Sequence, residues 1–257
     1  MTMFDDRKQN SYAGVSVVIP CLNEEAGIGP CVATINSHGV GEVLVVDGGS
    51  TDRTIEHASA AGARVVVERR RGYGQAMLTG MAALSPCCRI VLFIDGDGSD
   101  RPEMLPDVLA PILNGQADFV LGSRLRGDRE QGSLAPAQIV AGALVGFLIR
   151  LRYSVRYTDM SPFRAIRRDA LECLGMQEET FGWNLEMQMR AAAAGLRIVE
   201  VPVGQSRRAG GTSKVSGDLV TAVRAACVLM VTFLRLAVRT RPPRSPPSIG
   251  SNAAAAD

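Results

Sequence analysis

The sequence contains little histidine and no paired cysteines, and this excludes two common kinds of metal site. Only His38 and His57 occur among 257 residues, so a histidine-rich metal centre is not expected. The six cysteines lack the C-x-x-C spacing that typically binds zinc. The polar start of the chain, MTMFDDRKQN, has no apolar segment typical of a signal peptide, so we expect reduced, buried thiols.

Long apolar runs and a strong net charge are also missing. No stretch reaches the roughly 18 uninterrupted apolar residues that a spanning helix needs. The shorter runs at residues 139–149 and 225–234 predict helices of the core or of a membrane interface. The 28 basic and 26 acidic residues leave a net charge of +2, which does not indicate nucleic-acid binding. With 46% apolar residues, the chain is expected to fold as one or two domains.

Apolar, β-rich runs alternate with helical patterns in the first half of the chain. Strands are predicted at residues 15–20, 42–46, 63–67, 89–94 and 117–121. Helices are predicted between and after them, at residues 24–37, 52–61, 74–84 and 102–114. This order predicts an α/β fold with a mostly parallel sheet and helices on both faces.

The second half has three predicted helices and one strand. The helices cover residues 136–152, 181–194 and 215–238, and the strand covers residues 196–203. The apolar stripe of the first helix is expected at residues 139, 140, 143, 144, 147, 148 and 151. The stripe of the last helix is expected at Leu219, Val220, Val223, Cys227, Met230, Val231 and Leu234.

Composition divides the chain into four parts. We predict a flexible N-terminus (1–13), a main domain (14–214), an amphipathic helix suited to a membrane surface (215–239) and a disordered tail (240–257). From residue 219 to residue 256 there is no acid. Arg224, Arg235 and Arg239 share one face of the last predicted helix, which favours contact with an anionic membrane.

The segment Asp95-Gly96-Asp97-Gly98-Ser99-Asp100 directly follows a predicted strand. Ligands of open α/β sheets bind outside the carboxyl ends of the strands. Asp95 and Asp97 therefore predict a site for Mg²⁺ or Mn²⁺, which prefer oxygen ligands. The alternative is a polar loop rich in turn residues.

Two further strands end in acidic, turn-forming loops on the same predicted edge of the sheet. One loop contains Pro20, Asn23 and Glu24, and the other begins at Asp47. An acid in such a position can accept hydrogen bonds from a nucleobase or ribose. Each loop alone could be a turn that caps a helix, but three acidic loops at one edge favour a binding site.

Glycines and basic residues supply further candidates for ligand contact. Gly74 and Gly96 allow the backbone to approach a ligand closely. Forked donors and glycine turns suit phosphate, and the candidates are Arg124, Arg164, Arg208 and Lys214. Acidic metal loops together with basic phosphate contacts are typical of a site for a nucleoside-diphosphate substrate.

These motifs resemble family 2 glycosyltransferases. VVIPCLNEE, VVDGGSTDRT, GYGQA, FIDGDGSDRPE, GSR, DMSPFRA, GWNLEM, EVPV and RRAGGTSK occur in that family's order over residues 15–214. The chain is most similar to the branch with dolichyl-phosphate mannose synthase and bacterial polyprenyl-phosphate sugar transferases. The resemblance implies a GT-A fold, a UDP- or GDP-linked sugar donor, a divalent cation and inversion at the anomeric carbon.

The resemblance also implies roles for individual residues. Pro20, Asn23, Glu24 and Asp47 would hold the nucleoside, and Asp95 and Asp97 would hold the metal and diphosphate. Arg124, Arg208 and Lys214 would meet donor or acceptor phosphate. The chain departs from the pattern at Asp47-Gly48-Gly49-Ser50, at Ser99-Asp100-Arg101 and at D-M-S-P-F-R, which leaves the third metal ligand, the sugar and the acceptor open.

We therefore expect an inverting, metal-dependent glycosyltransferase of cell-envelope glycan synthesis, with polyprenyl phosphate as the acceptor. A lipid phosphate is already an anion, whereas a hydroxyl acceptor needs a base, for which Glu186 and Asp159 are the candidates. Either acid could instead form an ion pair with a nearby arginine. The alternatives are a soluble transferase with a small hydroxyl acceptor and a non-catalytic membrane-surface module. The expected location is cytoplasmic, peripheral on the inner membrane face.

Overall fold

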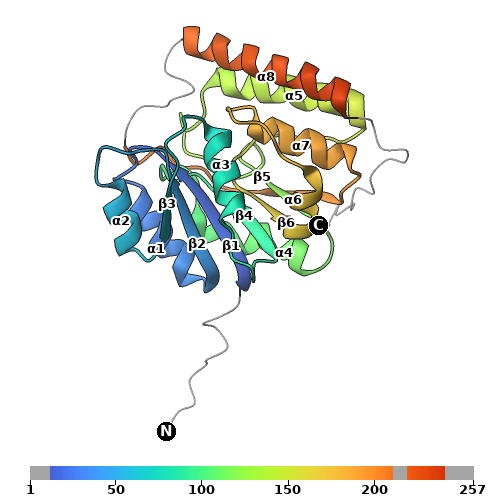
Figure 1. Cartoon of the computed structure of the whole chain (residues 1–257). Coiled ribbons are helices and arrows are strands. Elements are labelled where there is room, and N and C mark those ends of the chain that lie inside the picture. The colour runs from blue at the N-terminus through green and yellow to red at the C-terminus, as the bar shows by residue number, and fades with distance from the viewer. Residues whose placement is uncertain (1–11, 211–218, 241–257) are drawn as a thin grey trace.

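The computed structural model describes residues 12–210 and 219–240, in which a seven-stranded sheet lies between two layers of helices (Figure 1). The strands are β1 (Tyr12–Cys21), β2 (Val40–Asp47), β3 (Arg64–Val67), β4 (Ile90–Phe93), β5 (Phe119–Ser123), β6 (Arg164–Arg167) and β7 (Ile198–Pro202). Their order is β3-β2-β1-β4-β6-β5-β7, and only β6 runs antiparallel to its neighbours. The predicted mostly parallel sheet is confirmed.

The helices cover both faces of the sheet, as the βαβα order predicts. They are α1 (Ile28–Ser37), α2 (Thr54–Ala60), α3 (Tyr73–Ala82), α4 (Leu105–Leu113), α5 (Pro136–Tyr153), α6 (Arg168–Leu174), α7 (Trp183–Ala193) and α8 (Leu219–Arg239). Buried side chains of α1, α2 and α4 pack on one face, and those of α3, α5, α6, α7 and α8 pack on the other. A 3₁₀ turn, Pro102–Met104, precedes α4.

The sequence did not predict strand β6 or helix α6. β6 has four residues, R-A-I-R, and both end residues are charged, so it lacks the apolar run of a buried strand. Ala165 at its centre pairs with Leu92 of β4 on one side and with Val120 of β5 on the other. The strand therefore separates β4 from β5 and joins the two halves of the sheet.

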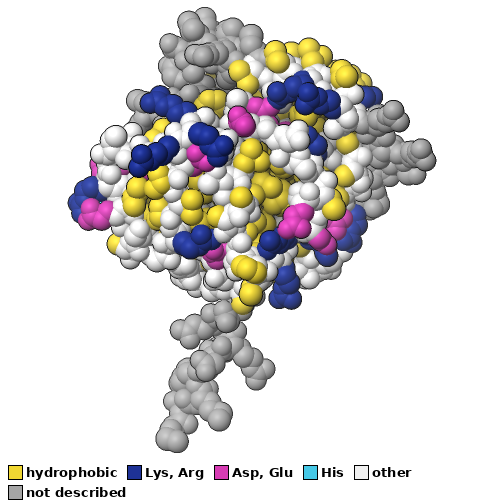
Figure 2. Space-filling view, viewed as in Figure 1, with side chains coloured by type: hydrophobic (Ala, Val, Ile, Leu, Met, Phe, Trp, Pro, Cys, Tyr) yellow, Lys and Arg dark blue, Asp and Glu magenta, His cyan; other side chains and the backbone are white. Residues whose placement is uncertain are grey.

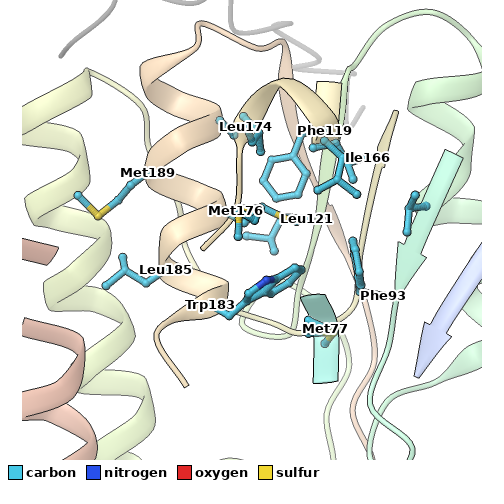
Figure 3. Packing of buried hydrophobic residues seen from close by; sticks show 14 of the residues in the cluster. Met77, Phe93, Phe119, Leu121, Ile166, Leu174, Met176, Trp183, Leu185 and Met189 are labelled. Carbon is cyan, nitrogen blue, oxygen red and sulfur yellow. The ribbon is translucent and has the colours of Figure 1, made fainter. Parts of the chain in front are cut away.

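The core on one face of the sheet is centred on Trp183, the first residue of α7 (Figure 3). Its side chain is fully buried and meets Phe93 edge-on, with 4.9 Å between ring centroids. Edge-to-face contacts of this kind stabilise by about 1 kcal/mol beyond area burial. Because Phe93 ends β4, the contact fixes α7 against the strand that leads into Asp95.

The predicted apolar stripe of α5 lies mostly on the exposed side of the helix, and Leu148 is its one member that packs against the core cluster. The side chains that enter the core are Val145, Ile149 and Tyr153, whereas Val140, Leu144, Phe147 and Leu151 are exposed. On α8, Phe233 and Leu236 are buried, while Val231 and Leu234 of the predicted stripe are exposed. The sequence left open whether these stripes pack in the core or face a membrane interface, because both helices are apolar around most of their circumference and periodicity alone does not select the side that packs.

Within the described ranges, no helix combines the length and the apolar character that crossing a membrane requires. Most of the predicted flexible N-terminus, most of the predicted tail and the candidate Lys214 lie outside the described residues.

Candidate active site

The loops that follow β1 and β2 are joined at the carboxyl edge of the sheet. Asn23 N donates to Ser50 Oγ at 2.8 Å, and Thr51 N donates to the side-chain oxygen of Asn23 at 2.8 Å. Glu24 N donates to Thr54 Oγ1, also at 2.8 Å. The predicted convergence of these two loops is confirmed.

The loop after β4 turns its carboxylates toward one another. Asp97 Oδ1 accepts from Ser99 N at 2.8 Å, and Asp100 Oδ2 accepts from Asp95 N at 3.1 Å. The hydroxyl of Tyr73, at the start of α3, donates to Asp95 Oδ1 at 3.2 Å. Three acids within six residues are thus held by their own loop and by one phenol.

This crowding of negative charge changes the acidity of the loop. Burial and the neighbouring charges of Asp97 and Asp100 raise the pKa of Asp95 well above its ordinary value. Burial and the charge of Asp97 likewise raise the pKa of Asp100 to about 7. A cation placed among these carboxylates would relieve the repulsion.

The residues present fit a divalent cation that also binds a substrate diphosphate. Oδ1 of Asp100 is buried and has no hydrogen-bond partner among the described residues. The described ranges contain no group of three acidic, histidine or cysteine side chains placed to hold a metal alone. Mg²⁺ is usually held by one or two carboxylates and completed by substrate phosphate and water, so two aspartates suffice.

Arg208 connects the β1 loop to the β4 loop. Its Nη2 lies 2.8 Å from Glu24 Oε1 and 3.2 Å from Asp97 Oδ2. Backbone bonds hold the segment after β7 along the acidic loop, from Ser206 N to Ser99 O (2.8 Å) and from Ala209 N to Asp97 O (3.0 Å). Residues far apart in sequence are thereby brought to one place, as the pattern of acidic and basic loops predicts.

The nucleoside candidates lie on the β1 and β2 loops. Pro20 is half-buried within β1, and Asn23 is exposed, with its backbone in the left-handed region at φ 55°. Asp47 is fully buried, and its Oδ1 accepts from Gly49 N (2.9 Å) and Ser50 N (2.8 Å). The carboxylate therefore shapes its own loop, and its contact with a nucleoside stays a prediction.

The two glycine candidates have packing roles in the structure. A Cβ on Gly96 would collide with Cys21 Sγ, so glycine lets the end of β4 approach the end of β1. A Cβ on Gly74 would collide with the carbonyl oxygen of Glu178, in the segment that leads into α7. Both positions are explained by close contact within the chain, and their contact with the donor stays a prediction.

Asp159 is engaged in an ion pair, which is one of the two possibilities that the sequence left open. Its two carboxylate oxygens accept from Nε and Nη2 of Arg124, each at 2.8 Å, and Oδ2 also accepts from Arg124 N at 2.9 Å. Burial alone would raise the pKa of Asp159, but the Arg124 guanidinium and backbone N–H groups hold it below its ordinary value. A carboxylate paired in this way is a weak base. Arg124 in turn uses its forked donors, Nε and Nη2, for Asp159.

Glu186 is also engaged in an ion pair and is an unsuitable general base. It is 1% exposed; its Oε1 accepts from Arg190 Nε at 2.8 Å, and its Oε2 accepts from the backbone of Gln177 and Glu178. These bonds tie the start of α7 to the segment before it.

Arg164 does not face a phosphate site in this structure. Its side chain is 0% exposed and donates to the carbonyl oxygens of Ser161 and Asn184. Burial lowers its pKa to about 10. The prediction of phosphate binding is corrected to a structural role, because the sequence pattern does not show that β6 carries this side chain inward.

Two residues at the site were not among the candidates. Tyr73 orients Asp95, whereas Gly74 is the only residue of the motif GYGQA among the sequence candidates. Asp100 contributes the unpartnered oxygen described above, at a position where the resemblance left the third metal ligand open. Both residues lie within motifs of the sequence, GYGQA and FIDGDGSDRPE, but only the fold shows that Tyr73 reaches the acidic loop that contains Asp100.

Comparison with known proteins places this geometry in a family. The profile of glycosyl transferase family 2 matches residues 16–175. An uncharacterized glycosyltransferase of Mycobacterium tuberculosis is 42% identical over 208 residues, which are 80% of this chain and 91% of that protein. A dolichyl-phosphate hexose transferase of Haloferax volcanii is 36% identical over 206 residues, covering 79% of this chain and 87% of its own.

A solved structure shows the same fold. Glucosyl-3-phosphoglycerate synthase from Mycobacterium tuberculosis, in complex with Mn²⁺, UDP-glucose and phosphoglyceric acid, superimposes with a TM-score of 0.67 at 25% identity. The match covers 90% of this chain and 81% of that one. The expected GT-A fold is thus confirmed, and the chain is a glycosyltransferase that belongs to glycosyl transferase family 2.

Proposed function

We propose that the chain transfers a sugar, with inversion, from a UDP- or GDP-linked donor to a polyprenyl phosphate in the presence of Mg²⁺ or Mn²⁺. Two relationships support the parts of this proposal. The similar synthase was crystallised with Mn²⁺ and UDP-glucose, and the similar transferase of Haloferax volcanii is named for dolichyl phosphate.

The observation that carries the choice of acceptor is the state of the two candidate bases. Asp159 is paired through both oxygens with Arg124, and Glu186 with Arg190 and two backbone N–H groups. A hydroxyl acceptor needs a group that takes its proton, and neither acid is available for this. A phosphate monoester is already ionised and attacks the anomeric carbon without a base.

The chain's own residues divide the remaining work. Asp95 and Asp97 would hold the cation, which when bound neutralises charge on the leaving diphosphate. Tyr73 orients Asp95, and Glu24 holds Arg208 beside the same loop. Arg208 would stabilise the leaving group from the side of the β7 segment.

A lipid-linked acceptor implies that the enzyme works at a membrane surface, as a peripheral protein on the cytoplasmic face. A soluble transferase with a small hydroxyl acceptor is the second candidate. It is supported by the complex of the similar synthase with phosphoglyceric acid. The segment Asp95-Gly96-Asp97, held in place by Ser99 and Tyr73, argues against a non-catalytic module.

The experiment is a transfer assay across UDP- and GDP-sugars with polyprenyl phosphate, phosphoglyceric acid or no acceptor, with Mn²⁺ or EDTA. We expect a Mn²⁺-dependent product only with polyprenyl phosphate. Transfer to phosphoglyceric acid alone would establish the second candidate, and equal turnover in EDTA would exclude a role for the cation.

A further inference from the structure

Large apolar side chains are exposed together on the two helices α5 and α8. The described residues contain ten exposed large hydrophobic side chains, and seven of them lie on these helices. They are Val140, Leu144, Phe147 and Leu151 on α5, and Val231, Leu234 and Val238 on α8. We call this set the α5–α8 face. Soluble monomers rarely expose a large contiguous apolar patch without a binding role.

The spacing of these residues places them on one side of each helix. On α5 they follow the pattern i, i+4, i+7, i+11, and on α8 they follow i, i+3, i+7. The opposite sides are buried in the core through residues such as Ile149 and Leu236. The exposed apolar side is therefore additional to the side that stabilises the fold.

The two helices lie side by side and are joined at one end (Figure 1). Arg152 Nη2 donates to the carbonyl oxygens of Ala237 (2.9 Å) and Thr240 (3.1 Å), and the hydroxyls of Tyr153 and Thr240 are also hydrogen-bonded. The face is thus presented by two connected helices and not by one helix that could turn independently.

The charged side chains on the two helices have one sign. Neither helix contains an aspartate or glutamate. Arg150 and Arg239 are exposed at the ends of α5 and α8, and no ion pair is recorded for either with another described residue. Figure 2 shows arginine side chains next to apolar side chains on this upper part of the molecule, with acidic side chains of other segments nearby. Arg235 is engaged with Glu178 and is not counted here.

We infer that the α5–α8 face docks onto a lipid surface that carries anionic head groups. The apolar side chains would enter the boundary between head groups and acyl chains, and the arginines would meet the head groups. This inference rests on the proposed lipid-phosphate acceptor, because it names the surface that brings the enzyme to it. A second copy of the chain is a poorer occupant, since a symmetric contact would bring like charges together.

The test is co-sedimentation of the full chain with vesicles of neutral lipid, with or without phosphatidylglycerol, at low and high salt. We expect binding that needs the anionic lipid and weakens with salt. The double variant Phe147→Ser with Leu151→Ser should bind roughly tenfold more weakly, because two side chains that enter the lipid are lost. Val67→Ser with Leu113→Ser is the matched control, since those side chains are similarly exposed (48% and 52%) on other elements. This control variant should bind vesicles as the wild type does.

Folding and acceptor choice are measured separately. Each variant is assayed in detergent with a short-chain polyprenyl phosphate, and the Phe147→Ser with Leu151→Ser variant should retain the wild-type rate there. Vesicle binding without transfer to any lipid phosphate would contradict the proposed acceptor and leave the docking face intact. Three results would overturn the docking inference. They are transfer in detergent by a wild-type chain that does not bind vesicles, an equal loss of vesicle binding in the control variant, and a dimer that only the Phe147→Ser with Leu151→Ser variant dissociates.

Discussion

The side chain of Arg208 places a positive charge between two carboxylates of the candidate active site. In the structure its guanidinium lies against Glu24 and Asp97, and its Nε is buried without a partner among the described residues. Asp97 is also a predicted metal ligand. A cation bound by Asp97 would therefore compete with Arg208 for one carboxylate oxygen when the donor is absent.

The first prediction follows from this competition. Arg208→Ala should bind Mn²⁺ about threefold to tenfold more tightly than the wild type without donor, because one charge-assisted bond to Asp97 is gone. The same variant should lose more than about tenfold in kcat/KM, because it lacks the guanidinium that we propose for contact with the leaving phosphate. Electron paramagnetic resonance titration with Mn²⁺ and steady-state kinetics measure the two effects.

Arg207→Ala is the control for this prediction, because Arg207 is exposed and donates to the carbonyl oxygen of Gln131. Weaker Mn²⁺ binding by Arg208→Ala than by the wild type would refute the competition.

The second prediction concerns Asp97 itself. Asp97→Asn should reduce kcat/KM by at least about a hundredfold, because the amide supplies no charge to the cation. Its thermal midpoint should change by only a few degrees, since the residue lies in a loop outside the core. Asp107→Asn, an exposed acid on α4, is the matched control. Normal turnover of purified Asp97→Asn would remove Asp97 from the metal site.

At the scale of elements, β6 shows why Arg164, whose predicted phosphate role was corrected to a structural one, matters to the fold. The strand joins β4 to β5, and Arg164 at its start is the charged side chain that satisfies carbonyl oxygens in the core. Arg167, at its other end, is exposed and pairs with Asp169. One strand thus carries a buried and an exposed arginine that can be compared directly.

The third prediction uses this pair. Arg164→Ala should lower the free energy of unfolding by about 3 kcal/mol, because buried carbonyl groups lose their donors and a cavity forms. Arg167→Ala should change it by less than about 0.5 kcal/mol, as expected for an exposed ion pair. Urea denaturation measures both. If Arg164→Ala were as stable as the wild type but failed to bind donor, the original assignment to phosphate would be restored.

The elements that the sequence predicted well are those with a strong local signal. The strands that precede the acidic loops are continuous apolar runs, and their parallel order brought Asn23, Glu24 and Asp97 to one edge as expected. β6 could not be predicted, because its four residues are held by pairing with strands on both sides. The exposed side of α5 could not be assigned either, since the helix is apolar almost all round and only tertiary packing selects its buried side.

For the whole molecule, the composition of the metal site predicts how ligands stabilise the fold. The described residues offer two aspartates to a cation and no group of three suitable side chains. The diphosphate must then supply further oxygen ligands.

The fourth prediction is therefore a cooperative effect on the thermal midpoint. Mn²⁺ alone should raise it little, whereas Mn²⁺ with UDP or GDP should raise it by several degrees, since a ligand stabilises through its affinity for the folded state. Differential scanning fluorimetry with each ligand singly and together measures this. Asp97→Asn should abolish the combined effect; a full shift with Mn²⁺ alone would indicate a metal site complete within the protein.

The position of β6 also affects how the chain can fold during synthesis. β1 to β4 all lie before residue 94 and pair with one another, so this half of the sheet can assemble as soon as it is made. β5 ends at Ser123, but both of its neighbours, β6 and β7, come later, the last ending at Pro202. Until β6 is made, both edges of β5 are unpaired, and unpaired strand edges are templates for aggregation. A ribosome stalled between residues 123 and 164 would therefore hold a nascent chain that depends on chaperones.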